Sequence, residues 1–309
     1  MSYPESPPRD PAVFDALFRP KAVAMVGAST QPEKLGYQVF RNLAEAGFSG
    51  PLYPVNPKAD AILGRKAFPT VADLPEAVDL AVIMVPARVV PETIRACGRK
   101  GARAAIVISG GFSETGPDGD RLQQEALAAA REAGIGLVGP NCQGVNHPYH
   151  GLCASWPLLT TRGCMAVVSQ SGTVGAALMD WASQEELGVS AFVSMGNRAD
   201  LDESDLLEYI AADPNTRAIA FYLESIKSVP RFLRAMATCP KPVVILKAGR
   251  TPKGRKAAES HTRSLAGRDE IYEGAFRQYR IHRAATLDEL YDAAKALAYL
   301  RRPGSGRRK

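Results

Sequence analysis

Leu80-Ala81-Val82-Ile83-Met84-Val85 is the stretch of this sequence that decides the fold. Six apolar residues in a row are typical of a strand buried on both faces, as the central strands of parallel sheets are. On both sides of this stretch, short apolar runs alternate with amphipathic helical segments, which is the pattern of parallel α/β folds. The strands predicted around this centre are residues 23–27, 52–55, 104–108 and 136–138, and the helices are 37–46 and 121–133.

The same alternation continues in the second half of the chain. The chain has 309 residues, which suffice for about two domains of ~150 residues each. We predict a Rossmann-like domain at 11–148, a second, flavodoxin-like doubly wound domain at 160–302, and a basic tail at 303–309. The junction is placed where residues 147–161 lose periodicity. In the second domain the predicted strands are 165–168, 190–194, 218–223 and 243–247, and the predicted helices are 172–184, 204–212, 230–237 and 287–300.

Composition excludes several classes of protein. The formal net charge is +6, but five of the positive charges lie in the last nine residues, so a basic face for nucleic acid is not indicated. The five cysteines form no C-x-x-C pair, which argues against a zinc site and a disulfide framework. No run of ~20 apolar residues and no signal peptide are recognisable, so we expect a cytoplasmic protein that does not span a membrane.

A turn of small residues follows the first predicted strand. Gly27-Ala28-Ser29 would let the backbone approach a phosphate at the start of the next helix, near Lys34. The second strand ends in Asn56-Pro57-Lys58, where an NAD site would carry a carboxylate. Lys58 suits an additional phosphate, such as the 3′-phosphate of CoA or the 2′-phosphate of NADP. A solvated loop lysine explains Lys58 equally well.

Pro and Gly mark the ends of the remaining strands of the first domain. The third strand leads into Val85-Pro86, the fourth into Ser109, and the fifth into Asn141. Open α/β sheets bind ligands at the carboxyl ends of their strands, so several such loops on one edge favour a cleft there. Pro and Gly also simply punctuate strand ends.

A long segment rich in Gly and cations, 249–267, interrupts the second domain and contains His261. Long loops inside compact domains are often functional, and a neutral imidazole is a good nucleophile toward phosphorus. A phosphoryl group on the imidazole would add negative charge, which needs hydrogen-bond donors and cations nearby. The cations of the segment and a helix start at Ser171, Gly172 and Thr173 offer them. Glu224, at the end of an apolar strand, is the candidate carboxylate that fixes the imidazole. An ordinary strand-end acid and a solvated histidine are the alternatives.

Taken together, these stretches resemble the NDP-forming acyl-CoA synthetases, over roughly residues 12–300. In the first domain, the stretches that carry the resemblance are Val26-Gly27-Ala28-Ser29, Tyr53-Pro54-Val55-Asn56-Pro57-Lys58, Val85-Pro86-Ala87 and Gly139-Pro140-Asn141-Cys142. In the second domain, they are Ser169-Gln170-Ser171-Gly172, Gly196-Asn197-Arg198-Ala199-Asp200, Lys247-Ala248-Gly249-Arg250-Thr251 and the segment 257–267 around His261.

The resemblance implies an alpha-type subunit with CoA as cofactor and three reversible steps. Acyl-CoA and phosphate give an acyl phosphate, the acyl phosphate phosphorylates the loop histidine, and the phosphohistidine transfers its group to ADP or GDP. By position, His261 is the carrier and Glu224 its carboxylate partner, and Ser171, Gly172 and Thr173 hold the phosphate. The nucleotide and Mg²⁺ are expected on a separate ATP-grasp beta-type subunit, which makes the protein a hetero-oligomer.

One departure from the family pattern bears on activity. Arg263 stands where the family commonly has Gly. Its guanidinium could grip the phosphate in bidentate fashion, or it could block a partner or stiffen the loop. A non-catalytic CoA or acyl-CoA-binding regulatory protein is therefore the alternative function. An NADP-dependent reductase accounts for the first domain but not for the histidine segment.

Overall fold

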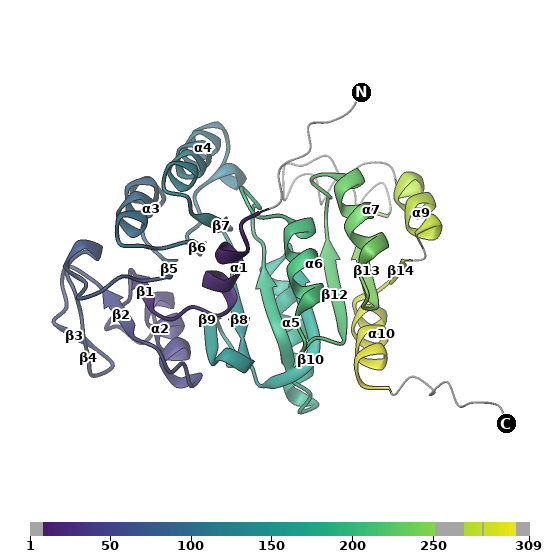
Figure 1. Ribbon diagram of the computed structural model, residues 1–309, viewed down its shortest axis with the longest axis horizontal. Helices are drawn as coiled ribbons and strands as arrows, with labels where there is room; N and C mark the ends of the chain where they lie inside the picture. Colours follow the sequence, from purple (N-terminus) through teal and green to yellow (C-terminus); the bar gives the residue numbers. More distant parts are fainter. Residues whose placement is uncertain (1–8, 251–268, 280, 301–309) are drawn as a thin grey trace.

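Five parallel strands form the first sheet, in the order β2-β1-β5-β6-β7. The computed structural model describes residues 9–250, 269–279 and 281–300 (Figure 1). Every residue of β1, β5 and β6 is buried, as their apolar sequences require. The strands of this sheet are β1 (Val23–Val26), β2 (Leu52–Val55), β5 (Leu80–Ile83), β6 (Ala104–Val107) and β7 (Gly136–Val138), and a small hairpin consists of β3 (Ala61–Ile62) and β4 (Arg65–Lys66).

Helices cover both faces of the first sheet. Helices α3 (Val90–Arg99) and α4 (Pro117–Glu132) pack on one face, and α2 (Leu35–Glu45) packs on the other. Helix α1 (Pro11–Phe18) was not predicted, although Asp10 caps it by accepting from the Ala12 N–H at 2.9 Å. The short 3₁₀ helices are η1 (Val71–Asp73), η2 (Ala87–Val89), η3 (Ser113–Thr115) and η4 (Pro148–His150).

The second sheet has seven strands, in the order β14-β13-β12-β10-β11-β8-β9. Strands β10 to β14 run parallel, whereas β8 pairs antiparallel with β11 and β9 pairs antiparallel with β8. The strands are β8 (Gly144–His147), β9 (Leu152–Ser155), β10 (Arg162–Ser169), β11 (Val189–Ser194), β12 (Ala218–Leu223), β13 (Val243–Lys247) and β14 (His282–Arg283). The mixed α/β architecture, with a Rossmann-like first sheet and a flavodoxin-like second unit, confirms the predicted fold class.

Helices also lie on both faces of the second sheet. One face carries α5 (Gly172–Gln184) and α10 (Leu287–Tyr299), whose apolar residues pack against Val167, Ala220 and Val244. The other face carries α6 (Glu203–Ala212), α7 (Val229–Thr238) and α9 (Asp269–Gln278). Asp202 starts α6 by accepting from the N–H groups of Ser204 and Asp205, and Asp205 Oδ2 accepts in return from the Asp202 N–H at 3.0 Å, which completes a capping box.

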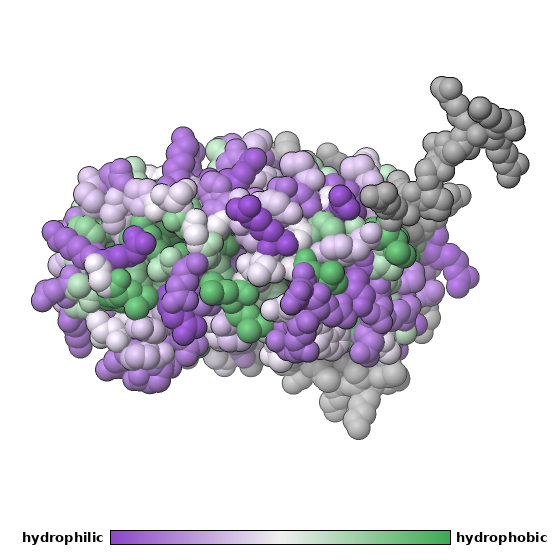
Figure 2. All heavy atoms as spheres, turned by 90° about the horizontal axis from the view of Figure 1, so that it is seen from below, coloured by the Kyte–Doolittle hydropathy of each residue, from purple (hydrophilic) through white to green (hydrophobic). Residues whose placement is uncertain are grey.

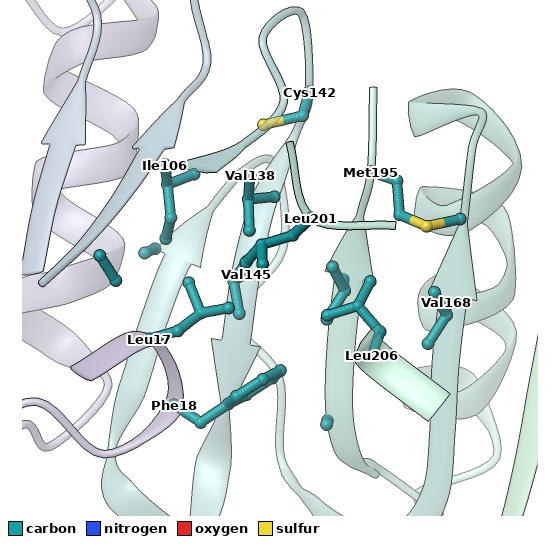
Figure 3. Packing of buried hydrophobic residues seen from close by; sticks show 14 of the residues in the cluster. Leu17, Phe18, Ile106, Val138, Cys142, Val145, Val168, Met195, Leu201 and Leu206 are labelled. Atoms are coloured by element: carbon teal, nitrogen blue, oxygen red, sulfur yellow. The ribbon is translucent and has the colours of Figure 1, made fainter. Parts of the chain in front are cut away.

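One hydrophobic core joins the two sheets, so they form a single packed body. Helix α1 contacts both β6 and β8, and its Leu17 and Phe18 lie among apolar side chains from both sheets (Figure 3). The side chains that Figure 3 labels in this core are Leu17, Phe18, Ile106, Val138, Cys142, Val145, Val168, Met195, Leu201 and Leu206. The buried Asn42 adds a polar link, because its Nδ2 donates to the Ser155 carbonyl at 2.9 Å.

The segment between the predicted domains differs from its expectation. Residues 147–161 were expected to lack regular structure, but β8 and β9 form a hairpin that extends the second sheet. Strand β7 belongs to the first sheet and β8, which begins at Gly144, belongs to the second, so the chain passes from one sheet to the other between them. The division at 148 and 160 stays a prediction about domains, and the tail at 303–309 lies outside the described residues.

The surface is mostly polar. Figure 2 shows a face on which hydrophilic side chains dominate and apolar ones emerge in separate places. Within the described ranges, no helix combines the length and the apolar character that crossing a bilayer requires.

Candidate active site

The loops at the carboxyl edge of the first sheet are tied to one another by hydrogen bonds. The Asn56 side chain donates to the Ala28 carbonyl at 2.7 Å, and the Ser109 hydroxyl donates to the Val85 carbonyl at 2.6 Å. The Asn141 N–H donates to the Ser109 carbonyl at 2.9 Å. The structure therefore brings the predicted cofactor-binding loops together at one edge, in the order of their strands.

Gly27 shapes the turn at which this edge meets α2. Its φ is +94°, and a Cβ at this position would lie 2.1 Å from the Met84 carbonyl oxygen, so only glycine fits. Gly36, in the first turn of α2, approaches just as closely, because its Cβ would lie 2.3 Å from the Gly27 carbonyl oxygen. The first N–H groups of α2 thus stand directly beside the turn, an arrangement that suits a phosphate.

The remaining predicted residues of the first domain surround this turn. Ser29 is half-buried and accepts from the Gln31 N–H at 3.1 Å, and Lys34 is the exposed N-cap residue of α2. Lys58 is exposed, and its N–H donates to Asn56 Oδ1 at 2.8 Å, so Asn56 connects two loops. Pro86 is exposed at the same edge. Two cations and a helix N-terminus therefore border the Gly27 turn.

A polar cluster connects the two domains beside Asn141. Asn141 Nδ2 donates to Asn197 Oδ1 at 3.3 Å, and Asn197 Nδ2 donates to Glu114 Oε2 at 2.6 Å. Burial alone would raise the pKa of Glu114, but hydrogen bonds from Asn197 and from the N–H groups of Phe112 and Gly111 outweigh burial and lower it. Glu114 is therefore held as a carboxylate, and it orders the loop after β6.

In the second domain, the predicted phosphate-holding residues begin helix α5. Ser171 is the N-cap residue and accepts from the Val174 N–H at 3.4 Å, and Gly172 and Thr173 are the first two helical residues. Thr173 is exposed and Gly172 is half-buried, so the N–H groups of this helix end are accessible. The arrangement can hold an anion, and the helix dipole favours it.

Glu224 follows directly after β12 and is 6% exposed. Its backbone N–H donates to Gln170 Oε1 at 2.7 Å, and Gln170 directly precedes Ser171. Burial, assisted by the charge of Glu224, raises the pKa of Tyr222 to about 12. Because β12 and β10 are neighbours in the sheet, the structure brings Glu224 and the start of α5 to the same edge.

The edges of the two sheets lie on the same side of the molecule. The loop after β11 runs along the loop after β7, with the Asn197 N–H donating to the Pro140 carbonyl and the Ala199 N–H to the Gly139 carbonyl, both at 2.9 Å. In the same loop, Arg198 reaches the residue after Glu224, because its Nη2 donates to Ser225 Oγ at 2.6 Å. A continuous series of contacts therefore leads from Asn141 to Glu224.

His261 and Arg263 lie outside the described residues, since the structure describes the chain up to residue 250 and again from 269. Strand β13 is the last described strand before them in the sequence, and it ends at the same edge as β12. Its last residue, Lys247, is only 2% exposed; its Nζ donates to the Ala248 carbonyl at 2.7 Å and lies 4.7 Å from the centre of the Tyr272 ring. A buried cation thus stands where the chain leaves the sheet after β13.

Sequence reasoning did not single out Gln170, Arg198, Asn197 or Glu114 as site residues. The first three stood in stretches that carried the family resemblance, without a role of their own. A polar residue directly after a buried strand is the signal that could have identified Gln170. Asn197 and Glu114 meet only in the folded protein, because 83 positions separate them along the chain.

Comparison with known proteins finds matches for both halves of the chain. Residues 21–148 match the family described as CoA binding domain, and residues 162–297 match the family described as succinyl-CoA ligase like flavodoxin domain.

Two curated relatives are alpha subunits of ADP-forming acetate–CoA ligases from Pyrococcus furiosus. Ligase I is 45% identical over 297 residues, covering 94% of this chain and 64% of the relative, and ligase II is 42% identical over 286 residues, covering 92% and 62%. A solved structure of the dinucleotide-forming acetyl-coenzyme A synthetase 1 of Candidatus Korarchaeum cryptofilum, in complex with phosphate and ADP, is similar with a TM-score of 0.89 and 42% identity, covering 93% of this chain and 63% of that one. The chain spans just under two thirds of the length of these relatives.

Proposed function

We propose, from the premise that the chain belongs to the NDP-forming acyl-CoA synthetase family, that it is the alpha-type part of an acid–CoA ligase, which binds CoA and carries the phosphoryl group. One observation carries the proposal. The loops tied together at the edge of the CoA-binding domain connect, through Asn141, Asn197 and Arg198, to the edge that holds Glu224 and the start of α5. An acyl group released from CoA at the first edge would meet phosphate at the second.

The proposed first step forms an acyl phosphate. A phosphate oxygen attacks the thioester carbonyl, the carbon–sulfur bond breaks, and CoA leaves as a thiol. The N–H groups at the start of α5, capped by Ser171, would hold the attacking phosphate, because an anion is stabilised at a helix N-terminus. Gly27 and the start of α2 would hold CoA phosphates, with Lys34 and Lys58 at the rim.

The second step transfers the phosphoryl group to His261. The neutral imidazole attacks phosphorus, the bond between phosphorus and the acyl oxygen breaks, and the carboxylic acid leaves as its anion. Glu224 is the proposed partner of the imidazole, since a carboxylate fixes its tautomer and stabilises the proton on its other nitrogen. Arg263 is proposed to contact the phosphoryl group.

In the third step, the phosphoryl group passes from His261 to a nucleoside diphosphate. We propose ADP, because the relatives in Pyrococcus furiosus are named ADP-forming. The ATP-grasp beta-type subunit is the proposed source of the site for nucleotide and Mg²⁺. Acetate is the first acid to test, again from the names of these relatives, and the cytoplasm is the proposed location.

An isotope experiment tests this function on the chain itself. The chain is mixed in stoichiometric amount with acetyl-CoA and phosphate labelled with ¹⁸O, and the released acetate is analysed by mass spectrometry. Phosphorolysis followed by phosphoryl transfer leaves one phosphate oxygen in the acetate, so we expect acetate with a single ¹⁸O. Acetate without ¹⁸O, or no release of acetate above a protein-free control, contradicts the proposal and favours a CoA-binding regulatory protein.

A further inference from the structure

The two residues that follow β12, Glu224 and Ser225, are held by side chains from neighbouring strands. Gln170 Oε1 accepts from the N–H groups of Glu224 and Ser225, at 2.7 and 3.1 Å, and Gln170 Nε2 donates to the Ser225 carbonyl at 2.6 Å. A side-chain amide can replace a neighbouring strand in this way, because it offers one acceptor and two donors. Gln170 thus continues the pairing of β10 with β12 beyond the last paired residues.

Arg198 holds the second residue of this segment, Ser225, through its guanidinium. Its Nη1 donates to the Ser225 carbonyl at 3.1 Å and its Nη2 to Ser225 Oγ at 2.6 Å. The Arg198 backbone is left-handed, with a φ of +54°, a conformation that is uncommon for residues other than glycine. Such backbone is maintained when surrounding contacts over-determine it, and it clusters at functional sites.

A buried carboxylate fixes Arg198 in turn. Arg198 Nη1 donates to Glu203 Oε2 at 2.8 Å, and the side chains are 9% and 0% exposed. The other oxygen of Glu203 accepts from the Lys227 N–H, and Lys227 Nζ donates to the Arg198 carbonyl at 3.2 Å. The turn after Glu224 and the loop around Arg198 are therefore locked together by a closed set of hydrogen bonds, with the Glu203 carboxylate buried and the Lys227 side chain exposed.

We propose that Gln170 and Arg198 are positioning residues, which fix the two-residue segment Glu224–Ser225 so that the Glu224 carboxylate is held in one position for phosphoryl transfer. This inference rests on the proposed function. Neither residue acts on the substrate; each acts through Glu224. Because a displacement of about 1 Å of a catalytic group can lower a rate by about 100-fold, holding Glu224 through Gln170 and the adjoining Ser225 through Gln170 and Arg198 has a direct consequence for phosphoryl transfer.

The test uses acetyl [³²P]phosphate as the phosphoryl donor, so that the acyl-CoA step is bypassed. Gln170→Met keeps the length of the side chain and removes its hydrogen bonds. Gln184→Met is the matched control, because Gln184 lies in an exposed part of α5 and contacts only Asp180 among the hydrogen bonds of the described residues. Arg198→Lys keeps the charge opposite Glu203 but loses the fork that reaches both groups of Ser225. Thermal unfolding of each variant reports on folding separately.

We expect Gln170→Met and Arg198→Lys to lower the maximal labelling rate about tenfold or more, while the half-saturating donor concentration and the affinity for CoA stay unchanged. In a Glu224→Gln background, Gln170→Met should cause no further decrease, because its effect passes through the carboxylate. An equal decrease in both backgrounds would assign Gln170 a merely structural role and overturn the inference. Should Gln170→Met fail to fold, Arg198→Lys decides by the same comparison.

His261→Asn separates this inference from the function on which it rests. If His261→Asn is labelled like the wild type, the carrier assignment itself is wrong. If His261→Asn is not labelled and both Gln170→Met and Arg198→Lys react at the wild-type rate, only the positioning role is wrong.

Discussion

Gly36→Ala tests whether the contact between α2 and the Gly27 turn forms the phosphate site. The added Cβ would lie 2.3 Å from the Gly27 carbonyl oxygen, whereas ordinary van der Waals contact begins at 3.4 Å. The start of α2 must therefore move by about 1 Å, and overpacking of this kind typically costs ~1–3 kcal/mol of stability. The same movement stretches a hydrogen bond of about 2.9 Å between a helix N–H and a phosphate beyond its useful range.

The loss of one hydrogen bond to a charged group weakens binding by ~1.5–3 kcal/mol, which corresponds to about 10–100-fold in Kd. Isothermal titration calorimetry with CoA measures this change, and denaturant unfolding measures the change in stability. Gly274→Ala is the matched control, because it lies in α9 and its Cβ would meet nothing within 4 Å. We expect this control to bind CoA normally and to be slightly more stable. A Gly36→Ala variant with wild-type affinity and stability would refute the reasoning.

Four further outcomes can be measured on single variants. Asn42→Ala leaves the buried Ser155 carbonyl without its donor, so we expect the free energy of unfolding in denaturant to fall by ~1–3 kcal/mol; no change would speak against a shared core. Burial lowers the pKa of His147 in the folded protein, so the contribution of the neutral imidazole to stability is present above pH ~6.5 and lost as the pH falls. The free energy of unfolding should therefore change less between pH 7 and 5 in His147→Gln than in the wild type. An equal change in both proteins contradicts the reasoning. Hydrogen bonds from Asn197 and backbone N–H groups lower the pKa of Glu114 despite its burial, so the contribution of its carboxylate to stability is present above pH ~4.3 and lost in acid. The difference in free energy of unfolding between wild type and Glu114→Gln should therefore shrink toward pH 3. A difference that stays constant contradicts this prediction. Lys58→Ala should lower the affinity for CoA about fivefold in calorimetry and leave the affinity for dephospho-CoA unchanged, since an exposed ion pair contributes ~1 kcal/mol. Equal losses of affinity for both ligands would show that Lys58 does not bind the 3′-phosphate.

The parallel strands of both sheets, apart from the short β14, could be predicted from the sequence because their apolar runs are continuous. The range 218–223 coincides with β12, and 243–247 coincides with β13. Strand β8 escaped prediction, because Asn146 and His147 interrupt its apolar character. His147 is buried against Phe18 of α1, and the buried Asn146 Nδ2 donates to Met179 Sδ of α5 at 3.8 Å. Contacts of this kind depend on tertiary structure and leave no periodic signal.

The candidate site was predictable to the extent that it consists of turns at strand ends. Gly27 lies beside the first turn of α2 and Ser171 is the N-cap residue of α5, so both predicted strand-to-helix turns are present, and the binding of anions there stays a proposal. The roles of Gln170 and Arg198 could not be predicted, because they hold backbone atoms of Glu224 and Ser225 that lie 27 to 55 positions away along the chain. Side chains that support a site in this way carry no local pattern of spacing.

Phosphoryl transfer to one imidazole is the central claim, and mass-spectrometric mapping of the phosphate tests it most directly. The chain is incubated with acetyl-CoA and phosphate, digested at alkaline pH, where phosphohistidine survives, and sequenced by fragmentation. We expect one additional phosphoryl group, located on His261 and absent from the His261→Asn variant. A phosphoryl group on another residue, or a chain that stays unmodified while acetyl-CoA is consumed, would contradict the account.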